Sequence, residues 1–82
     1  MNKYFVVVYV PFLEQSFDLF IPAGKSVTNV TKLIIKSLNA ITDGHYNIGD
    51  AKLYFKDNGK MVDITTIVKN SGIHNGSRLI LL

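Results

Sequence analysis

The side chains that could do nucleophilic, acid–base or metal chemistry are few and scattered. The 82 residues include no cysteine, which excludes a thiolate nucleophile, a disulfide and any zinc or iron–sulfur site that needs cysteine ligands. The two histidines, His45 and His74, fall in different expected loops, and neither has a second ligand at a metal-site spacing. The six carboxylates stand mostly in turns, where aspartate makes local hydrogen bonds. We therefore expect no catalytic residues, no metal and no cofactor.

One segment imitates a phosphate-binding loop. Ala23-Gly-Lys-Ser26 stands between an expected strand and an expected helix, as such loops do. The phosphate loop also needs a glycine at the start of its GxxxxGK pattern, so that backbone N–H groups can wrap a phosphate, but Leu19 occupies that position. The segment is therefore interpreted as a turn followed by a helix cap, with the hydroxyl of Ser26 accepting from the first helical turn.

The first half of the chain predicts a hairpin and a helix. Residues 4–10 are β-branched or aromatic throughout, which is typical of a strand that is apolar on both faces. Residues 16–21 alternate and complete a hairpin with the first strand. An apolar stripe at helical spacing follows Ser26, and Asp43-Gly44 ends that helix. The members of the stripe are Val27, Val30, Leu33, Ile34, Leu38 and Ile41.

The second half predicts shorter elements. We expect a strand at residues 51–56, a hairpin turn at Asp57-Asn58-Gly59, a short returning strand at 60–62, one helical turn over 64–68 and a last strand at 77–82. One helix laid across a mixed sheet buries the helical stripe and one sheet face together. The order of elements therefore predicts the α+β class and a β-grasp fold.

Length and composition indicate a single folded domain over residues 1–82. The apolar fraction is 48% and the mean hydropathy +0.22, which is enough material for a core. The formal net charge of +3 is mild, so nucleic-acid binding is not favoured. The apolar run from Tyr4 to Leu13 resembles a signal peptide, but no small-x-small cleavage site follows it, and a bilayer needs about twenty residues. We expect a buried strand there, a cytoplasmic protein and no direct membrane insertion.

The spacing of these elements resembles ubiquitin, with Ser26-Val27-x-x-Val30 opening the helix and Leu53-Tyr-Phe55 as third strand. Phe17-Asp-Leu-Phe-Ile-Pro-Ala23, the helix over 27–38 and Ser71-Gly-Ile-His-Asn-Gly-Ser-Arg-Leu-Ile-Leu-Leu82 are similar to the YukD/EsaB family. These are small bacterial ubiquitin-like proteins associated with type VII (WXG100/ESX) secretion systems. The resemblance implies a non-enzymatic accessory or regulator that binds a protein component of the secretion machinery. Related domains occur fused to a membrane component, so recruitment to the inner face of the membrane is compatible with this role.

The end of the sequence departs from ubiquitin. A transferable modifier needs a flexible tail that ends in Gly-Gly, whereas this sequence ends in Leu82 at the end of an expected strand. A branched side chain and a tethered backbone both obstruct activation of the carboxylate. We therefore expect binding without covalent conjugation.

The sheet face away from the helix is the predicted protein-binding site. If the inward residues are Phe17, Leu19, Ile21, Leu53, Phe55, Leu79 and Leu81, the outward set is Phe20, Tyr54, Ile80 and Leu82. The first strand adds either Phe5, Val7 and Tyr9 or Val6, Val8 and Val10, and the sequence leaves both registers open. Lys52, Lys56 and Arg78 form an expected basic rim. An apolar strip of this kind suits a protein partner or a second copy of the chain.

The sequence also leaves open two alternative ligands, namely acidic lipids or an acidic partner on the helix, and RNA. Lys25, Lys32 and Lys36 indicate a solvated helix face, with acidic lipids or an acidic partner as the alternative ligand. The net charge and the Pro22-Ala-Gly24 entry to the helix also allow a small β-grasp RNA-binding regulator, similar in outline to TGS domains. A salt titration with RNA separates that alternative, because phosphate contacts weaken steeply with salt.

Overall fold

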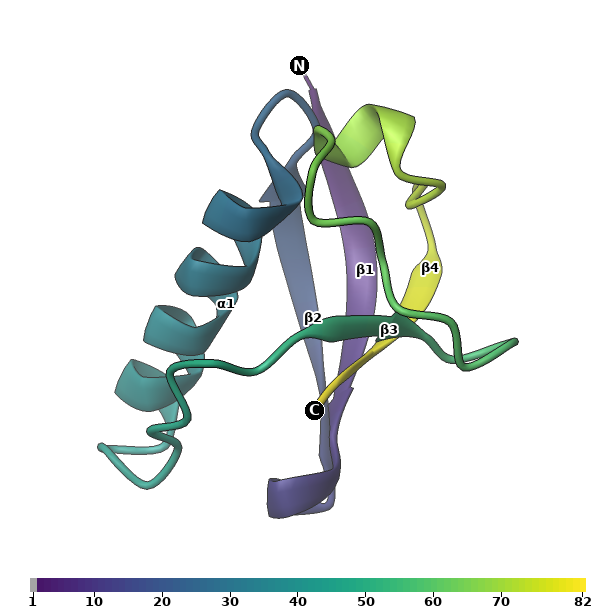
Figure 1. Ribbon diagram of the computed structural model, residues 1–82. Coiled ribbons are helices and arrows are strands. Elements are labelled where there is room, and N and C mark those ends of the chain that lie inside the picture. Colours follow the sequence, from purple (N-terminus) through teal and green to yellow (C-terminus); the bar gives the residue numbers. More distant parts are fainter. Residues whose placement is uncertain (1) are drawn as a thin grey trace.

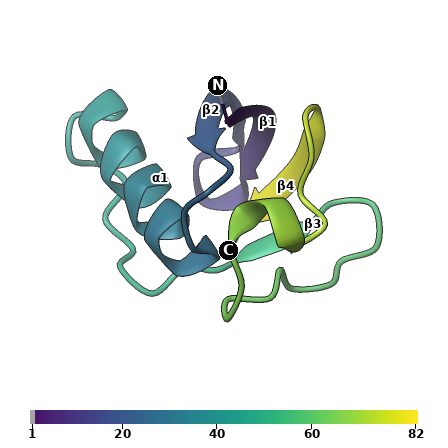
Figure 2. The same ribbon diagram turned by 90° about the horizontal axis from the view of Figure 1, so that it is seen from above.

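A computed structural model describes residues 2–82 and confirms the expected β-grasp (Figure 1). The strands form one mixed sheet in the order β2-β1-β4-β3. Their bounds are β1 Lys3–Val10, β2 Gln15–Pro22, β3 Leu53–Phe55 and β4 Ser77–Leu81. The long helix α1 (Val27–Ile41) covers one face of this sheet (Figures 1 and 2). Within residues 2–82, no helix is both long enough and apolar enough to cross a membrane.

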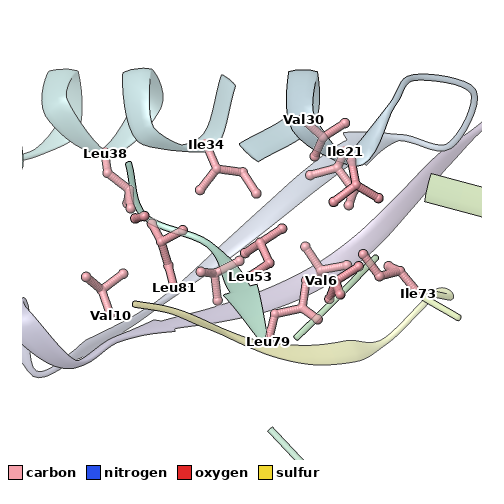
Figure 3. Close-up of a cluster of buried hydrophobic side chains, with 14 of the residues drawn as sticks. Val6, Val10, Ile21, Val30, Ile34, Leu38, Leu53, Ile73, Leu79 and Leu81 are labelled. Carbon is pink, nitrogen blue, oxygen red and sulfur yellow. The ribbon is translucent and has the colours of Figure 1, made fainter. Parts of the chain in front are cut away.

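The core lies between α1 and the sheet and settles the register of β1. Val6, Val8 and Val10 are fully buried, so Phe5, Val7 and Tyr9 belong to the opposite face. The helix contributes Val30, Ile34 and Leu38 from above, as Figure 3 shows. β3 and β4 contribute Leu53, Leu79 and Leu81, while Phe17, Leu19 and Phe55 are only partly buried. The expected inward set is therefore confirmed, with Phe17, Leu19 and Phe55 at the edge of the core.

The two central strands are parallel. β1 pairs with β4 over Val6–Tyr9 and Ser77–Ile80, and each of these strands also has an antiparallel neighbour. A parallel pair needs a long crossover connection, which here contains α1. The β1–β2 hairpin turns through a short 3-10 helix, Pro11–Leu13, and Glu14 takes a left-handed φ of 54°.

The start of α1 is as predicted, but its apolar stripe is narrower. The hydroxyl of Ser26 accepts from the N–H of Asn29 at 3.0 Å, so Ala23-Gly-Lys-Ser26 is a turn and a cap. Leu33 and Ile41 are exposed, which contradicts their assignment to the core. The sheet covers only part of the helix circumference. Thr31 is buried instead, and its hydroxyl is satisfied there because it donates to the carbonyl of Val27.

The segment after β3 differs from its prediction. β3 has three residues rather than the six expected over 51–56. Residues 60–62 form no strand, and Met61 makes one isolated antiparallel bridge with Tyr54 before the chain turns away. The helical turn is a 3-10 helix at Val68–Asn70, later than predicted. Residues 64–68 do not form the predicted helical turn, because their last residues pair with the segment before α1. Ile67 forms a bridge with Ser26, and the N–H of Val68 donates to the carbonyl of Lys25.

The entry to β4 depends on a glycine. Gly72 has a backbone φ of +94°, which residues that carry a side chain rarely adopt. A Cβ atom built there would lie 3.3 Å from the ring of Phe55, so a larger residue would also push against the edge of the core.

A candidate protein-binding face on the sheet

The outer face of the sheet carries a row of apolar side chains that runs across its strands. In the observed register Tyr9 stands opposite Ile80, Ile80 opposite Tyr54, and Tyr54 opposite Met61. Directly opposed residues in a sheet project from the same face. We call Tyr9, Ile80, Tyr54 and Met61 the apolar row. Met61 is half exposed and the other three are partly exposed, so the row is open to a partner.

Leu82 adds to the apolar face beside this row, two residues beyond Ile80 along the chain. The backbones of Leu82 and Lys52 donate to each other at 2.9 Å in both directions, which makes them an opposed pair beyond β3 and β4. The side chain of Leu82 is 66% exposed. Three of the four predicted apolar site residues, Tyr54, Ile80 and Leu82, therefore do lie together.

Phe20 lies on the same face at the β2 edge of the sheet. It stands opposite Phe5, and the two ring centroids are 5.6 Å apart. Val7 connects this aromatic pair to the apolar row along β1, with Asp18 and Arg78 opposite it on its two sides. The apolar path across the face is therefore continuous through β1, but it narrows between two charges of opposite sign.

The three predicted basic residues flank the apolar row. The ammonium of Lys56 is 5.8 Å from the centre of the Tyr9 ring, within range of a cation–π contact. Lys52 donates to the carbonyl of Asp50 at 3.1 Å. Arg78 Nη2 lies 3.3 Å from Asp57 Oδ1, and both side chains are largely exposed. An exposed pair of this kind contributes little to stability, so Arg78 can exchange Asp57 for a partner's carboxylate.

Phe5, Tyr9 and Met61 also belong to this face, for which the sequence offers Phe5 and Tyr9 only as one of two open registers. The first strand is apolar on both sides, so its pattern gave no reason to prefer the face of Tyr9. For Met61 the sequence predicts a returning strand but not the face from which its side chain projects. In both cases the missing information was strand register, which pairing with β4 and β3 supplies.

Other candidate groups lie apart from this face. His45 and His74 are exposed, and their Nδ1 atoms meet the carbonyls of Thr42 and Asn75 at 2.7 and 2.9 Å. Among residues 2–82, no three histidine or acidic side chains gather into a possible metal site. Thr65 lowers the pKa of Asp63 through hydrogen bonds from its hydroxyl and its N–H. The contacts of His45, His74 and Asp63 are with residues one to three positions away, so they stabilise local turns.

Two hollows border α1, and both are small. One, of about 100 Å³, lies beside Thr28, Lys32 and Ile64. The other, of about 210 Å³, is a groove between α1 and β2. Small-molecule sites usually enclose roughly 300–1,000 Å³, so these hollows suit single side chains of a partner better than a metabolite.

Tyr46 is an unpredicted anchor of the loop after α1. Its side chain is 1% exposed and packs edge-on against Phe12, with ring centroids 6.4 Å apart. Its N–H donates to the hydroxyl of Thr42, and its carbonyl accepts from the side chain of Asn39. Loop position alone suggested solvent exposure, so sequence reasoning missed this residue.

Burial, and secondarily the negative charge of Asp50, raises the pKa of Tyr46 above 10.0. The pKa of Tyr46 is therefore higher in the folded state than in the unfolded state. The resulting contribution of Tyr46 to the free energy of unfolding is complete below pH 10.0 and is lost as the pH rises through the folded pKa. Alkaline titration by tyrosine absorbance should show a late transition that Tyr46→Phe removes. If Tyr46→Phe left the titration curve unchanged, this assignment would be wrong.

Comparison with known proteins supports the fold. No protein-family model matches the chain, and no curated protein does. The N-terminal ubiquitin-like domain of the 4931431F19Rik protein superimposes with a TM-score of 0.75 at 25% identity, covering 99% of this chain and 74% of that one. The ubiquitin-like domain of the Mycobacterium tuberculosis type VII secretion system protein EccD1 gives 0.77 at 15% identity, covering 100% and 99%.

A third similar structure is the MycP5-free ESX-5 inner membrane complex. Its TM-score is 0.80 at 17% identity, and the match covers 100% of this chain but only 21% of the chain in that complex. This chain is therefore similar to one part of a larger protein there. Together these likenesses establish the ubiquitin-like β-grasp fold, and ubiquitin-like domains of type VII secretion components are among its structural neighbours.

Proposed function

We propose that this protein is a non-enzymatic accessory or regulator of a bacterial type VII secretion system, of the YukD/EsaB kind. It acts by non-covalent binding of a protein component of that system through the outer sheet face. The observation that carries the proposal is the apolar row, which crosses three strands and one flanking segment with its side chains at least partly open to solvent.

The chemistry of the face fits a protein partner. Tyr9, Tyr54 and Ile80 offer aromatic and branched apolar surface, the type that dominates binding energy when a partner removes it from water. Lys56 and Arg78 stand beside them and supply charge that orients a partner and speeds encounter. The proposed division is an apolar centre for affinity and a basic rim for orientation.

Two lines of support point to secretion. The motifs at Phe17–Ala23 and Ser71–Leu82 resemble the YukD/EsaB family. The EccD1 domain is similar in fold over nearly its whole length, and the ESX-5 complex in which a similar domain occurs is an inner membrane assembly. We propose a cytoplasmic protein that is recruited to the inner face of the membrane by such a component.

A photoreactive amino acid at Tyr54, incorporated in cells of the source organism, tests this function. We expect its crosslinks to contain a membrane component of the secretion system, because position 54 lies in the apolar row. The matched control carries the same group at Lys36, which is exposed on α1 on the other side of the molecule. Loss of the gene should also alter release of a WXG100 substrate.

Two results would contradict the proposal. One is equal crosslinking from positions 54 and 36, which would remove the sheet face as the interface. The other is RNA as the crosslinked species, together with affinity for RNA that falls steeply with salt. That second result would favour the RNA-binding alternative.

A further inference from the structure

One edge of the sheet is covered by another segment of the chain, and the other edge is open. At the β3 edge, residues 60–62 cover the backbone: the N–H of Phe55 donates to the carbonyl of Lys60 and the N–H of Val62 to that of Leu53. The other edge is β2, which has β1 as its only neighbour in the sheet of residues 2–82. An uncovered edge strand offers unpaired backbone groups to another strand.

The pairing register identifies these groups. The N–H of Ala23 donates to the carbonyl of Asn2 at 2.7 Å, which sets the alternation of the β1–β2 ladder. Residues 17, 19 and 21 therefore exchange hydrogen bonds with β1. Ser16, Asp18 and Phe20 direct their N–H and carbonyl groups away from β1, to the open side.

Apolar side chains flank this edge on both faces. Toward α1, the groove of about 210 Å³ is lined by Leu19, Phe20, Ile21, Pro22, Val30, Leu33, Ile34 and Ser37. Leu33, on the helix side, is 46% exposed, and Phe20, on the edge strand, is 70% exposed. An added strand would cover both, with its inward side chains in the groove.

Charge indicates what that strand carries. Asp18 stands at the centre of the open edge, and within residues 2–82 its carboxylate makes no ion pair. A residue directly opposite Asp18 projects from the same face, where a cation is favoured and a second carboxylate disfavoured. Antiparallel pairing of two copies centred on Asp18 would oppose two such carboxylates, which argues against a second copy in that register.

We propose that the β2 edge accepts an extended peptide segment of a partner as an additional strand, with a lysine or arginine opposite Asp18 and apolar residues on either side of it in the groove beside Leu33. This mode of recognition uses backbone hydrogen bonds for affinity and alternate side chains for specificity. It goes beyond the proposed function, because it uses a different surface and holds whether or not the apolar row binds a secretion component.

The probe is the blocked peptide Ser-Thr-Val-Lys-Leu-Thr-Ser, with a matched peptide that has Glu in place of Lys. Amide NMR titration at millimolar concentrations should show shifts centred on Ser16, Asp18 and Phe20. The Lys peptide should bind about two- to fivefold more tightly than the Glu peptide, the range expected of one cross-strand charge pair. Asp18→Lys should reverse this preference.

Two variants test the backbone and the groove separately. Asp18→Pro removes an outward N–H that β1 does not use, so the hairpin should persist while peptide binding is lost. Asp18→Ala keeps that N–H and should bind both peptides equally. Leu33→Lys, at an exposed helix position, should weaken both peptides without unfolding the protein.

Three outcomes would overturn the proposal. They are the absence of shifts in β2, shifts confined to the apolar row, and concentration-dependent dimerisation without peptide that Asp18→Pro abolishes. The last would assign the edge to a second copy. Ile80→Asp should leave peptide binding unchanged, so failure of this proposal and failure of the proposed function are distinguishable.

Discussion

Replacement of Leu79 by alanine should lower the free energy of unfolding by about 2–5 kcal/mol. Leu79 has no exposed surface and stands in β4 between Val8 of β1 and Phe55 of β3. Its truncation therefore leaves a cavity where both halves of the sheet and α1 meet. Because a domain of this size has roughly 5–15 kcal/mol in total, the loss removes a large share of its stability.

Urea unfolding followed by circular dichroism measures this effect. At roughly 4–8 °C per kcal/mol, thermal unfolding should also fall by about 10 °C or more. The matched control is Ile80→Ala, one residue along the same strand but on the outer face, which should cost much less because Ile80 is only partly buried. Equal losses for the two variants would mean that the register of β4 is wrong.

Replacement of Ile80 by aspartate, in contrast to Leu79→Ala, should weaken partner binding while the protein stays folded. Ile80 occupies the middle of the apolar row, between Tyr9 and Tyr54. A carboxylate there would have to be desolvated against a partner's apolar surface, and central interface residues commonly contribute 2 kcal/mol or more. We expect affinity for the partner identified by crosslinking to fall by roughly 30-fold or more, and Tyr54→Ala to weaken binding in the same direction. The folded protein should persist in both variants.

Titration calorimetry with that partner measures the affinity, and circular dichroism verifies the fold. Arg78→Ala provides a comparison within the face, since loss of a rim charge should act mainly on the association rate and its salt dependence. Lys36→Ala, on the exposed side of α1, should leave binding as in the wild type. If Ile80→Asp and Tyr54→Ala both bind like the wild type, the sheet face is not the interface.

Local pattern was sufficient for the elements with strong periodicity or clear capping chemistry. The β1–β2 hairpin, the capped start of α1 at Ser26 and the final strand were predicted within one or two residues. Alternation also assigned Leu53, Leu79 and Leu81 to the core and Tyr54 and Ile80 to the outer face. In these segments each residue's side follows from its neighbours in the chain.

Prediction failed where a contact distant in the sequence decides the outcome. Residues 60–62 and 64–68 look like a strand and a helical turn, but their backbone groups bind β3 and the approach to α1 instead. Leu33 and Ile41 have helical spacing, yet the sheet is too narrow to cover them. Tyr46 stands in a polar loop, but Phe12 and the end of α1 enclose it.

Sequence pattern is sufficient for the hairpin, the main helix and the last strand of the β-grasp, for the inward set of the second, third and last strands, and for the lack of any cysteine chemistry. Contacts between distant segments are needed to show that Phe5, Val7 and Tyr9 face outward, that Met61 pairs with Tyr54, and that the β2 edge is left open beside a groove. A strand's periodicity defines two faces but does not say which one meets the core when both are apolar. Pairing with neighbours remote in the chain makes that choice, and so it also decides what surface is left for a partner.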